Sequence, residues 1–444
     1  MTESALPVIG ANGVAIPEGT RGDAGFRTYE VFQRERVGQS TPKIKPAQLV
    51  SREFADNPYP LLAVLRENYP CYRDWLNNCF WITRYDDVTS ILTDGANYET
   101  RSKAWRLGIE GFGRDLRTAL PVLTAQANAW DASCRRLAES AIADFARRGE
   151  ADLATEFAAR LNMQLWLAML DPPAESAPQV AALLWRLHRG VSWDPHARWL
   201  GAAAADELVA ELAPLLEARR QAPGGDLISA VAGLELEGGP AQPQDLVATL
   251  LEMDFDTLHG ALANLWLALL TNAEEFDKVR GDSRCVKLAV LEAFRHSTPM
   301  IAAQRFARHE VERFGRLIPK GGLLVCSVAA ANRDPRVFAN PDRFIAGRKD
   351  ICHREARGQY RADGLATGIT PGLGPPTKHP AVPEDRPRSL YALTRDAVIT
   401  ASGALLEAVD DMVLADEAKP PSAICRRLGE MHACWHLPVR FRPR

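Results

Sequence analysis

Apolar residues recur every three or four positions through most of the central chain, which is the spacing of one face of an α-helix. The pattern predicts helices over 124–148, 152–170, 175–192, 200–220, 225–233 and 243–271. Two more helices are expected, one at 283–296 and a last one at 389–409. The bulk of the chain is therefore expected to be a helical body.

Short stretches of alternating or β-branched apolar residues predict strands outside this helical body. The expected strands are 79–85, 301–307, 323–329 and a strand pair near 430–442. Short helices are expected at 59–68 and 85–93, on either side of the first strand. A Pro-Lys-Gly-Gly turn at 319–322 separates two of the later strands. Small sheets should therefore accompany the helices.

Proline and glycine content suggests how the chain is divided. Residues 1–45 are expected to be a disordered leader, and 46–444 a single domain. The segment 335–388 is dense in proline and glycine, and such a long irregular stretch is typical of a functional loop. Within the domain, the α/β portion is expected at about 46–110 and 297–345, and the helical portion at about 111–296 and 389–410.

Charge and cysteine content exclude some classes of function. The chain has 53 basic and 56 acidic residues, a formal net charge of −3, and no polybasic segment that would predict nucleic-acid binding. It has no apolar run of membrane length, so a cytoplasmic protein that is not bound to a membrane is expected. The eight cysteines have no paired short spacing, which is typical of reduced thiols.

A charged pair on the helix at 283–296 is the first candidate for a structural role. Glu292 and Arg295 are three residues apart and share one helix face. If the pair is buried, it needs further hydrogen bonds to offset the cost of desolvation. Arg343, in the run Asn-Pro-Asp-Arg-Phe, is the candidate third member of such a network. A solvated surface pair is the alternative.

Further motifs follow Glu292-x-x-Arg295 in a fixed order. Downstream are Arg305, then Ala-Ala-Asn-Arg-Asp-Pro at 330–335, Phe-Ala-Asn-Pro-Asp-Arg-Phe at 338–344 and Gly-Arg at 347–348. In this order and spacing the chain closely resembles the cytochrome P450 superfamily of haem-thiolate monooxygenases, from about residue 50 to residue 442. The resemblance implies a mainly α fold with smaller β-sheets, the triangular helical fold of that family.

The family's proximal loop, which precedes the last long helix, departs from its usual form in this chain. The family pattern is Phe-Gly-x-Gly-x-(His or Arg)-x-Cys-x-Gly, and its cysteine binds the haem iron. An alignment on Leu-Gly-Pro-Pro at 373–376 puts Gly368 at the second glycine, Thr370 at the basic position and Gly372 at the cysteine. This alignment predicts that thiolate-driven oxygen activation is absent.

A second alignment of the same loop puts Lys378 at the ligand position, next to His379. Neither alignment supplies a cysteine, because the chain has none between Cys352 and Cys425. We therefore interpret the proximal loop as rebuilt.

The oxygen-activating helix of the family carries a small residue, a glycine, a variable residue, an acid and a threonine. The aligned run here is Met253, Asp254, Phe255, Asp256 and Thr257. The last two match the family's proton-delivery pair. The first two replace small residues, and their size and charge are expected to hinder haem. His259, two residues beyond the threonine, is expected to be a packed or surface residue and not a base.

The resemblance also implies partners for the haem propionates. Arg135 and Arg305 match family arginines, but Asp131 stands where the family commonly has a histidine, and its charge would repel a propionate. Together with the missing cysteine, this predicts that the chain does not carry haem, and that any haem it did bind would not be ligated by a thiolate.

A second constellation lies near the C-terminus. His432, Cys434 and His436 alternate, so they would point to one side of an extended strand. Two imidazoles and a thiol could bind zinc, with Asp254 or a water as the fourth ligand. Pocket-lining residues without a metal are the favoured alternative.

Three functions follow from these expectations. The favoured hypothesis is a haem-free protein of bacterial secondary metabolism that acts on a small apolar metabolite by dehydration, cyclisation or hydrolysis. Asp254, Asp256 and Thr257 would be its catalytic residues, with a desolvated carboxyl as general acid. The alternatives are a non-catalytic helper of a glycosyltransferase or other biosynthetic enzyme, and a haem enzyme with a non-thiolate ligand.

Overall fold

The computed structural model describes residues 42–351 except 70 and 193, and residues 390–444 except 416–420 and 427–429. The chain divides into two compact units. Unit 1 contains Met1–Thr100, Asn264–Val382 and Ser422–Cys434, and unit 2 contains Arg101–Ala263, Pro383–Pro421 and Trp435–Arg444. The pattern had assigned 264–296 to the helical portion, but these residues belong to unit 1. The fold is mainly α with small sheets, as predicted.

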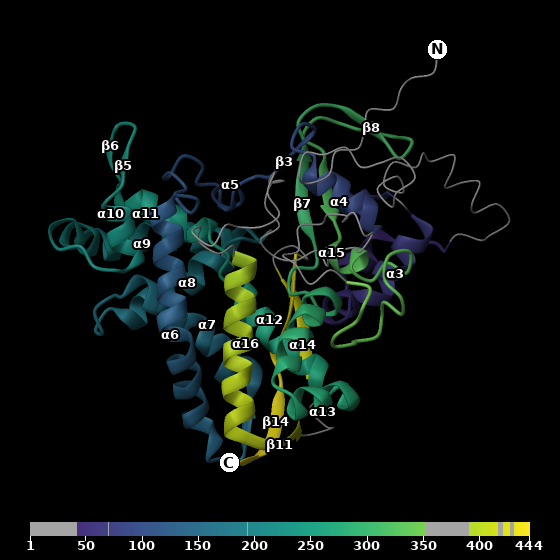
Figure 1. Ribbon diagram of the computed structural model, residues 1–444. Helices are drawn as coiled ribbons and strands as arrows, with labels where there is room; N and C mark the ends of the chain where they lie inside the picture. The colour runs from purple at the N-terminus through teal and green to yellow at the C-terminus, as the bar shows by residue number, and fades with distance from the viewer. Residues whose placement is uncertain (1–41, 70, 193, 352–389, 416–420, 427–429) are drawn as a thin grey trace. The chain divides into compact units, whose positions relative to one another are not determined.

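Unit 1 is built on a five-stranded sheet of order β1-β2-β10-β7-β3 (Figure 1). Its strands are Tyr72–Asp74, Cys79–Ile82, Leu323–Cys326, Ala303–Ala307 and Tyr98–Glu99. Only β10 and β2 run parallel, with Leu323 opposite Cys79; the remaining pairs are antiparallel. Antiparallel strands need only short connections, but the parallel pair joins segments far apart in the sequence.

Short helices accompany this sheet in unit 1. They are α2 (Arg52–Asp56), α3 (Tyr59–Asn68), α4 (Tyr85–Thr93), α13 (Ala273–Gly281), α14 (Arg284–His296) and α15 (Val328–Ala331), with a 3-10 turn η2 at Pro46–Val50. The apolar face of α4 packs on the sheet, because Val88 and Ile91 belong to the same buried cluster as Leu324 and Phe80. A two-stranded hairpin, β8 (Val311–Arg313) and β9 (Arg316–Ile318), was not predicted.

One strand of unit 1 is shorter than the pattern predicted. The strand expected at 323–329 ends at Cys326, and α15 begins two residues later. The reason is Ser327, whose Oγ accepts a hydrogen bond from the backbone N–H of Ala330 and so caps a helix. An apolar run by itself does not distinguish a buried strand from a short buried helix.

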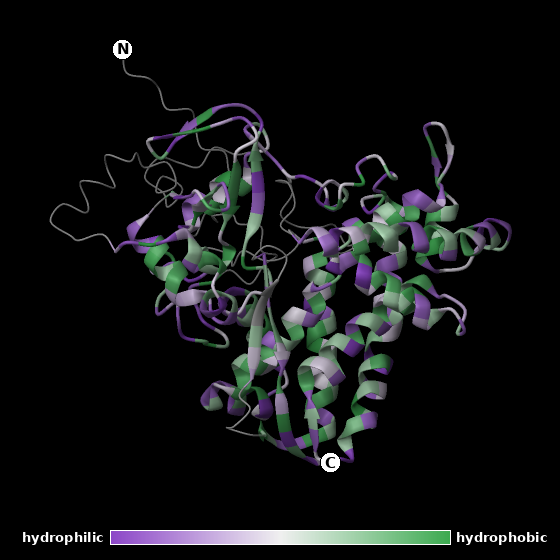
Figure 2. Ribbon diagram, turned by 180° about the vertical axis from the view of Figure 1, so that it is seen from behind, coloured by the Kyte–Doolittle hydropathy of each residue, from purple (hydrophilic) through white to green (hydrophobic). Residues whose placement is uncertain are grey.

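Unit 2 is predominantly helical (Figure 1). Its helices are α5 (Lys103–Leu107), α6 (Leu120–Ala146), α7 (Arg160–Leu170), α8 (Ala177–Arg189), α9 (Pro195–Gln221), α10 (Leu227–Ala232), α11 (Pro243–Glu252) and α16 (Leu390–Ala408), and α12 (Thr257–Leu270) begins in this unit. A π-helical segment at Leu153–Ala159 precedes α7, where the pattern predicted one helix over 152–170. Hydrophobic and hydrophilic residues alternate around these helices (Figure 2).

The strands near the C-terminus belong to different sheets. The pattern predicted a pair near 430–442, but β13 (Met431–His436) pairs with β12 (Ser422–Arg426). The last strand, β14 (Pro438–Pro443), lies between β11 (Val409–Leu414) and β4 (Glu150–Asp152). Only Leu437 separates β13 from β14, and one residue is too few for a hairpin turn.

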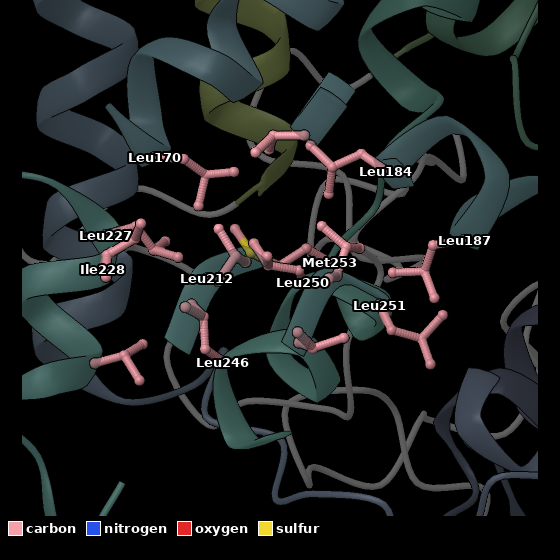
Figure 3. Packing of buried hydrophobic residues seen from close by; sticks show 14 of the residues in the cluster. Leu170, Leu184, Leu187, Leu212, Leu227, Ile228, Leu246, Leu250, Leu251 and Met253 are labelled. Atoms are coloured by element: carbon pink, nitrogen blue, oxygen red, sulfur yellow. The ribbon is translucent and has the colours of Figure 1, made fainter. Parts of the chain in front are cut away.

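The core of unit 2 is a cluster of leucines contributed by several helices. Leu170, Leu184, Leu212, Leu246 and Leu250 are all fully buried and point toward one another (Figure 3). No helix of the described residues is long and apolar enough to cross a membrane.

Two glycines bring α8 and α9 into backbone contact. A Cβ on Gly190 would lie 2.5 Å from the Cα of Gly201, and one on Gly201 would lie 2.6 Å from the Cα of Gly190. Such a contact can only be relieved by moving backbone. Gly190→Ala should therefore lower the free energy of unfolding by about 1–3 kcal/mol, the usual cost of overpacking, in urea denaturation.

The matched control for this prediction is Gly403→Ala. Gly403 lies within α16, and a Cβ there would meet nothing within 4 Å. Alanine is favoured over glycine in a helix interior by about 1 kcal/mol, so this variant should be no less stable than the parent protein. Equal destabilisation by the two changes would contradict the proposed contact.

A buried carboxyl in unit 1 makes stability depend on pH. Burial raises the pKa of Asp87, in α4, to about 8, although Arg313 and Arg84 act in the opposite direction. The folded protein therefore keeps this carboxyl neutral where the unfolded chain ionises it. Its contribution to stability is complete below the unfolded pKa of about 4 and is lost as the pH rises through about 8.

Asp87→Asn should weaken the fall of the melting temperature between pH 5 and pH 8, because the amide stays neutral throughout. Glu312→Gln, on the exposed side of β8, is the control and should retain the parent profile. Melting curves at a series of pH values make the comparison. An unchanged pH profile for Asp87→Asn would show that this carboxyl is already ionised in the folded protein.

Candidate functional site

The helix expected at 243–271 is interrupted. Helix α11 ends at Glu252, the backbone of Met253 is extended with φ −64° and ψ 152°, and α12 begins at Thr257. Residues 253–256 form this α11–α12 break. Side chains from elsewhere in unit 2 bond its carbonyls: Lys103 Nζ donates to Met253 O over 2.6 Å, and Asn162 Nδ2 donates to Phe255 O over 2.8 Å. The interruption therefore leaves these two carbonyls with partners.

The three predicted catalytic residues lie at this α11–α12 break. Asp256 and Thr257 are each 1% exposed. The hydroxyl of Thr257 donates to the Asp254 carboxylate, and Asp256 Oδ1 lies 3.1 Å from Nη2 of Arg189. The two carboxylates thus contact different side chains. A buried acid and a buried hydroxyl at consecutive positions can hold and pass a proton at the start of α12.

The other two residues of the break pack into the core of unit 2. Met253 was expected to crowd a haem, but its side chain lies in the leucine cluster beside Leu250 and Leu251 (Figure 3). The Phe255 ring stacks on His188 with centroids 4.6 Å apart and lies 5.1 Å from the Trp166 ring. These contacts explain why two bulky residues are accommodated here.

Two aromatic residues near the break were missed by the sequence analysis. The rings of Trp185, on α8, and Trp435, on β13, have centroids 5.7 Å apart. His259 is buried and packs edge-on against Trp435 with centroids 4.3 Å apart, so of the two expected alternatives, packed or surface, it is packed. No local motif identifies these tryptophans, because their contacts join segments about 250 residues apart.

The pair Glu292 and Arg295 is buried in unit 1, with side chains 1% and 0% exposed. Two hydrogen bonds of 2.7 and 2.9 Å join them. Arg295 also donates to the carbonyls of Asn332 and Pro341, each over 2.8 Å. The buried network expected from the sequence is therefore present, and its donors are satisfied, as a buried charge requires.

The predicted third member of this network was wrong. Arg343 is exposed and contributes only its carbonyl, which accepts from Arg295 over 3.2 Å. Besides Arg295, the second guanidinium that contacts Glu292 is that of Arg348, at 3.3 Å. Arg348 also contacts Asp350 at 2.6 Å. The left-handed backbone at Gly347, with φ 77°, precedes Arg348 at this turn. A five-residue difference in a loop is beyond what sequence spacing resolves.

The two candidate propionate-binding arginines differ in their surroundings. Arg135 is half-exposed and already paired with Glu139 and Glu407. Arg305, on β7, is partly buried, and among the described residues its hydrogen bonds go only to the carbonyls of Gln304 and Leu92. Desolvation lowers the pKa of Arg305 from its usual value. Glu430 raises the pKa of Arg305 but does not outweigh desolvation, so a carboxylate hydrogen-bonded to the guanidinium would stabilise the cation further.

The three candidate zinc ligands are used in other ways. His432 Nε2 lies 3.2 Å from the carbonyl of Asp56, and desolvation lowers the pKa of His432. Cys434 is fully buried, and His436 Nδ1 lies 2.7 Å from Asp152. Within the described parts of the chain, no group of three or more histidine, cysteine or acidic side chains is arranged to hold a metal ion. The zinc hypothesis therefore has no structural support.

The proximal loop lies outside the described residues, and with it Gly368, Thr370, Gly372, Lys378 and His379. Burial raises the pKa of four described cysteines to about 12, so these remain core thiols: Cys71, Cys79, Cys134 and Cys326. Cys434 is a further buried thiol, and its backbone N–H donates to Asn264 Oδ1 over 2.9 Å.

An open pocket of about 620 Å³ lies in unit 1 between η2, α2 and the start of α3. Lys45, Phe54 and Leu61 are among its lining residues, and none of the predicted site residues takes part. This hollow is therefore separate from the candidate site.

Comparison with known proteins identifies relatives over most of the chain. Pulcherriminic acid synthase of Bacillus subtilis is 28% identical over 350 residues, covering 73% of this chain and 85% of that protein. The structure of cytochrome P450 PksS of the Bacillus subtilis bacillaene polyketide synthase matches with a TM-score of 0.70 and 22% identity, over 90% of this chain and all of that one. The structure of P450BioI in complex with an acyl-ligated carrier protein also gives 0.70, at 21% identity, over 88% of this chain and all of that one. No family model matches the chain.

These relatives contradict the favoured hypothesis. Further curated relatives also carry the name cytochrome P450. The predictions of a haem-free protein, of non-oxidative chemistry and of a non-thiolate ligand are therefore wrong. No finding supports the helper of a glycosyltransferase. The expectation that haem is absent was drawn mainly from one loop, at 365–376, whereas the similarity to the relatives extends over about 350 residues. The absence of a thiolate donor from the chain is not shown, since Cys434 is a buried thiol.

The correction from Arg343 to Arg348 makes a stability prediction. Arg348→Ala removes the second cation from Glu292, which stays paired with Arg295, so the expected loss is that of hydrogen bonds to charged groups, about 1.5–3 kcal/mol. Arg343→Ala removes an exposed side chain and should change the free energy of unfolding by less than about 0.5 kcal/mol. Urea denaturation of the two variants makes the test, and a larger loss for Arg343→Ala would restore the original assignment.

Proposed function

We propose that this chain, which sequence and fold relate to the cytochrome P450 superfamily, catalyses a haem-dependent oxidation of a small metabolite. The observation that carries the proposal is the pair Asp256 and Thr257, buried side by side where α12 begins. An acid followed by a threonine at this position is the proton-delivery pair that the sequence resemblance implies.

A haem supplies the iron at which dioxygen is bound and reduced. The described residues offer a partner for its carboxylates in Arg305, a desolvated cation bonded only to neutral carbonyls among those residues. A propionate would provide the charge-assisted hydrogen bonds that favour a guanidinium. Arg135 is a weaker candidate because two glutamates already neutralise it. The donor set thus fits the group through Arg305.

The chain's own contribution is to hold and move protons. Thr257 Oγ1 donates to the Asp254 carboxylate, so its oxygen lone pairs can accept from a third group. Asp256 Oδ1 is held by Arg189 and lies in a dry environment. General acid–base groups in such positions typically contribute about 10²–10⁴-fold to a rate. Asp256 and Thr257 are therefore our proposed catalytic residues, and Asp254 holds the threonine hydroxyl.

A haem-dependent oxidation also requires an electron donor and a substrate. Insertion of one oxygen atom from O₂ into a substrate consumes two electrons and two protons and releases water, so an electron-donating protein is required. The relative PksS is named for polyketide biosynthesis, and P450BioI is described with a fatty acid on a carrier protein. For this chain we propose a small, moderately apolar substrate and a cytoplasmic location.

The proposal also concerns which cysteine supplies the thiolate that binds the haem iron. Among the described cysteines, four are core thiols with a pKa of about 12, and Cys285 is partly exposed on α14. Cys434 is also a buried thiol, and we take it as the candidate donor to be tested among the described cysteines. Cys352 and Cys425 are the remaining candidates, and nothing described bears on their side chains.

Protein purified from haem-replete cells should show a strong Soret band with about one iron per chain. The carbon-monoxide complex of the reduced protein should absorb where sulfur-ligated haems absorb, because a thiolate donates electron density to the iron. Cys434→Ser then assigns the donor. Loss of the sulfur-type band assigns it to Cys434, and its retention assigns it to another cysteine. A colourless, iron-free protein would refute the proposed function.

A further inference from the structure

Arg189 is the last residue of α8, and it contacts two other segments of unit 2 as well as its own helix. Its Nη2 lies 3.1 Å from Asp256 Oδ1 in the α11–α12 break. Its guanidinium carbon lies 4.1 Å from the centre of the Trp185 ring and 5.2 Å from that of Trp435. One cation thus bonds a carboxylate while resting against two indole rings. We call Arg189, Trp185 and Trp435 the arginine clamp.

The parts of the arginine clamp restrain one another. Trp185 and Arg189 are four residues apart, so they share one face of α8. The two indole rings lie at 76° to each other, with centroids 5.7 Å apart. A guanidinium is planar and lies flat on aromatic rings while its edge donates hydrogen bonds, which an ammonium cannot do. The rings therefore limit the directions in which Arg189 can donate.

The carboxylate that the clamp reaches belongs to the residue directly before α12. Asp256 is the last residue of the break, and its carbonyl accepts from Gly260 in the first turn of α12. Its side chain is 2% exposed, whereas that of Arg189 is 27% exposed. The residue before it, Phe255, is held by His188, the neighbour of Arg189 on α8. Helix α8 thus holds two consecutive residues of the break.

We propose that Arg189 is a positioning residue, which holds the Asp256 carboxylate beside Thr257, and that Trp185 and Trp435 fix the guanidinium that does so. This rests on the proposed function, in which Asp256 delivers a proton. Misplacing a catalytic group by about 1 Å can cost about 100-fold in rate. The clamp would therefore affect turnover without itself touching the reacting atoms.

The first test measures oxygen consumption by the haem-loaded protein with a surrogate ferredoxin and its reductase. Arg189→Gln should lower the rate at least about 10-fold and raise the solvent deuterium isotope effect, because proton delivery becomes slower. Arg189→Lys keeps the charge but lacks the planar group that stacks on an indole ring and donates from its edge, so it should recover only part of the rate. Trp435→Leu should give an intermediate loss.

The matched control is Arg186→Gln on the same helix. Arg186 has an exposed pair with Glu207, at 2.8 and 2.9 Å, and makes none of the clamp contacts. Its rate and isotope effect should stay within about 2-fold of the parent protein. The inference is overturned if Arg189→Gln behaves like Arg186→Gln, or if its rate falls with an unchanged isotope effect and no recovery in Arg189→Lys.

A second readout does not depend on haem or activity. Thermal melting of Arg189→Gln, Asp256→Asn and the double variant reports whether the two side chains act on each other. If Arg189 holds Asp256, the double variant should lose less than the sum of the two single losses. Additive losses would overturn the inference. A protein without a Soret band would refute the proposed function, and this melting comparison would still decide whether Arg189 holds Asp256.

Discussion

The interruption between α11 and α12 depends on one constraint: a buried backbone carbonyl needs a hydrogen-bond donor. A continuous helix would have satisfied the carbonyls of residues 253–255 internally. In this chain Lys103 and Asn162 donate to two of them from other parts of unit 2. Because these donors are in place, the backbone can leave the helix and return to it with little loss. The position of Asp256 and Thr257 at a helix start is the consequence.

The residues of the break divide between packing and chemistry. Met253 and Phe255 face the apolar core and stabilise the interruption, whereas Asp254 and Asp256 contact Thr257 and Arg189. This alternation resembles that of a strand, because the backbone at Met253 is extended. Met253 and Asp254 were interpreted as obstacles to a haem on the assumption of a continuous helix. Their side chains point differently once the helix is broken.

In the network around Glu292, in unit 1, ion pairs and hydrogen bonds offset the cost of burying charged groups. One buried carboxylate faces two guanidinium groups, Arg295 and Arg348, and the backbone N–H of Ile345 also donates to it over 3.0 Å. Burying three charges is costly, so each donor and acceptor needs a partner. The network joins α14 to the loop at 341–348. It is a structural element whose sequence signature extends well beyond Glu-x-x-Arg.

Periodicity by itself determined the helical character of the chain, and α3 and α4 begin and end where the pattern placed them, because an apolar stripe and its flanking polar residues are local properties. The Glu292 and Arg295 pair was also recognisable, since three-residue spacing on a helix fixes proximity. The order of the motifs further indicated the family. Inference from one atypical loop then led to a wrong conclusion about haem, against the similarity of the whole chain.

Tertiary structure decided what depends on distant partners. The break after Glu252 follows from donors about 90 and 150 residues away in the sequence. The choice of Arg348 over Arg343 follows from the path of a loop, and the contact of Trp435 with Arg189 follows from the placement of a C-terminal segment. Local sequence carries no information about such contacts, because their free energy depends on chain closure and burial that only the folded protein provides.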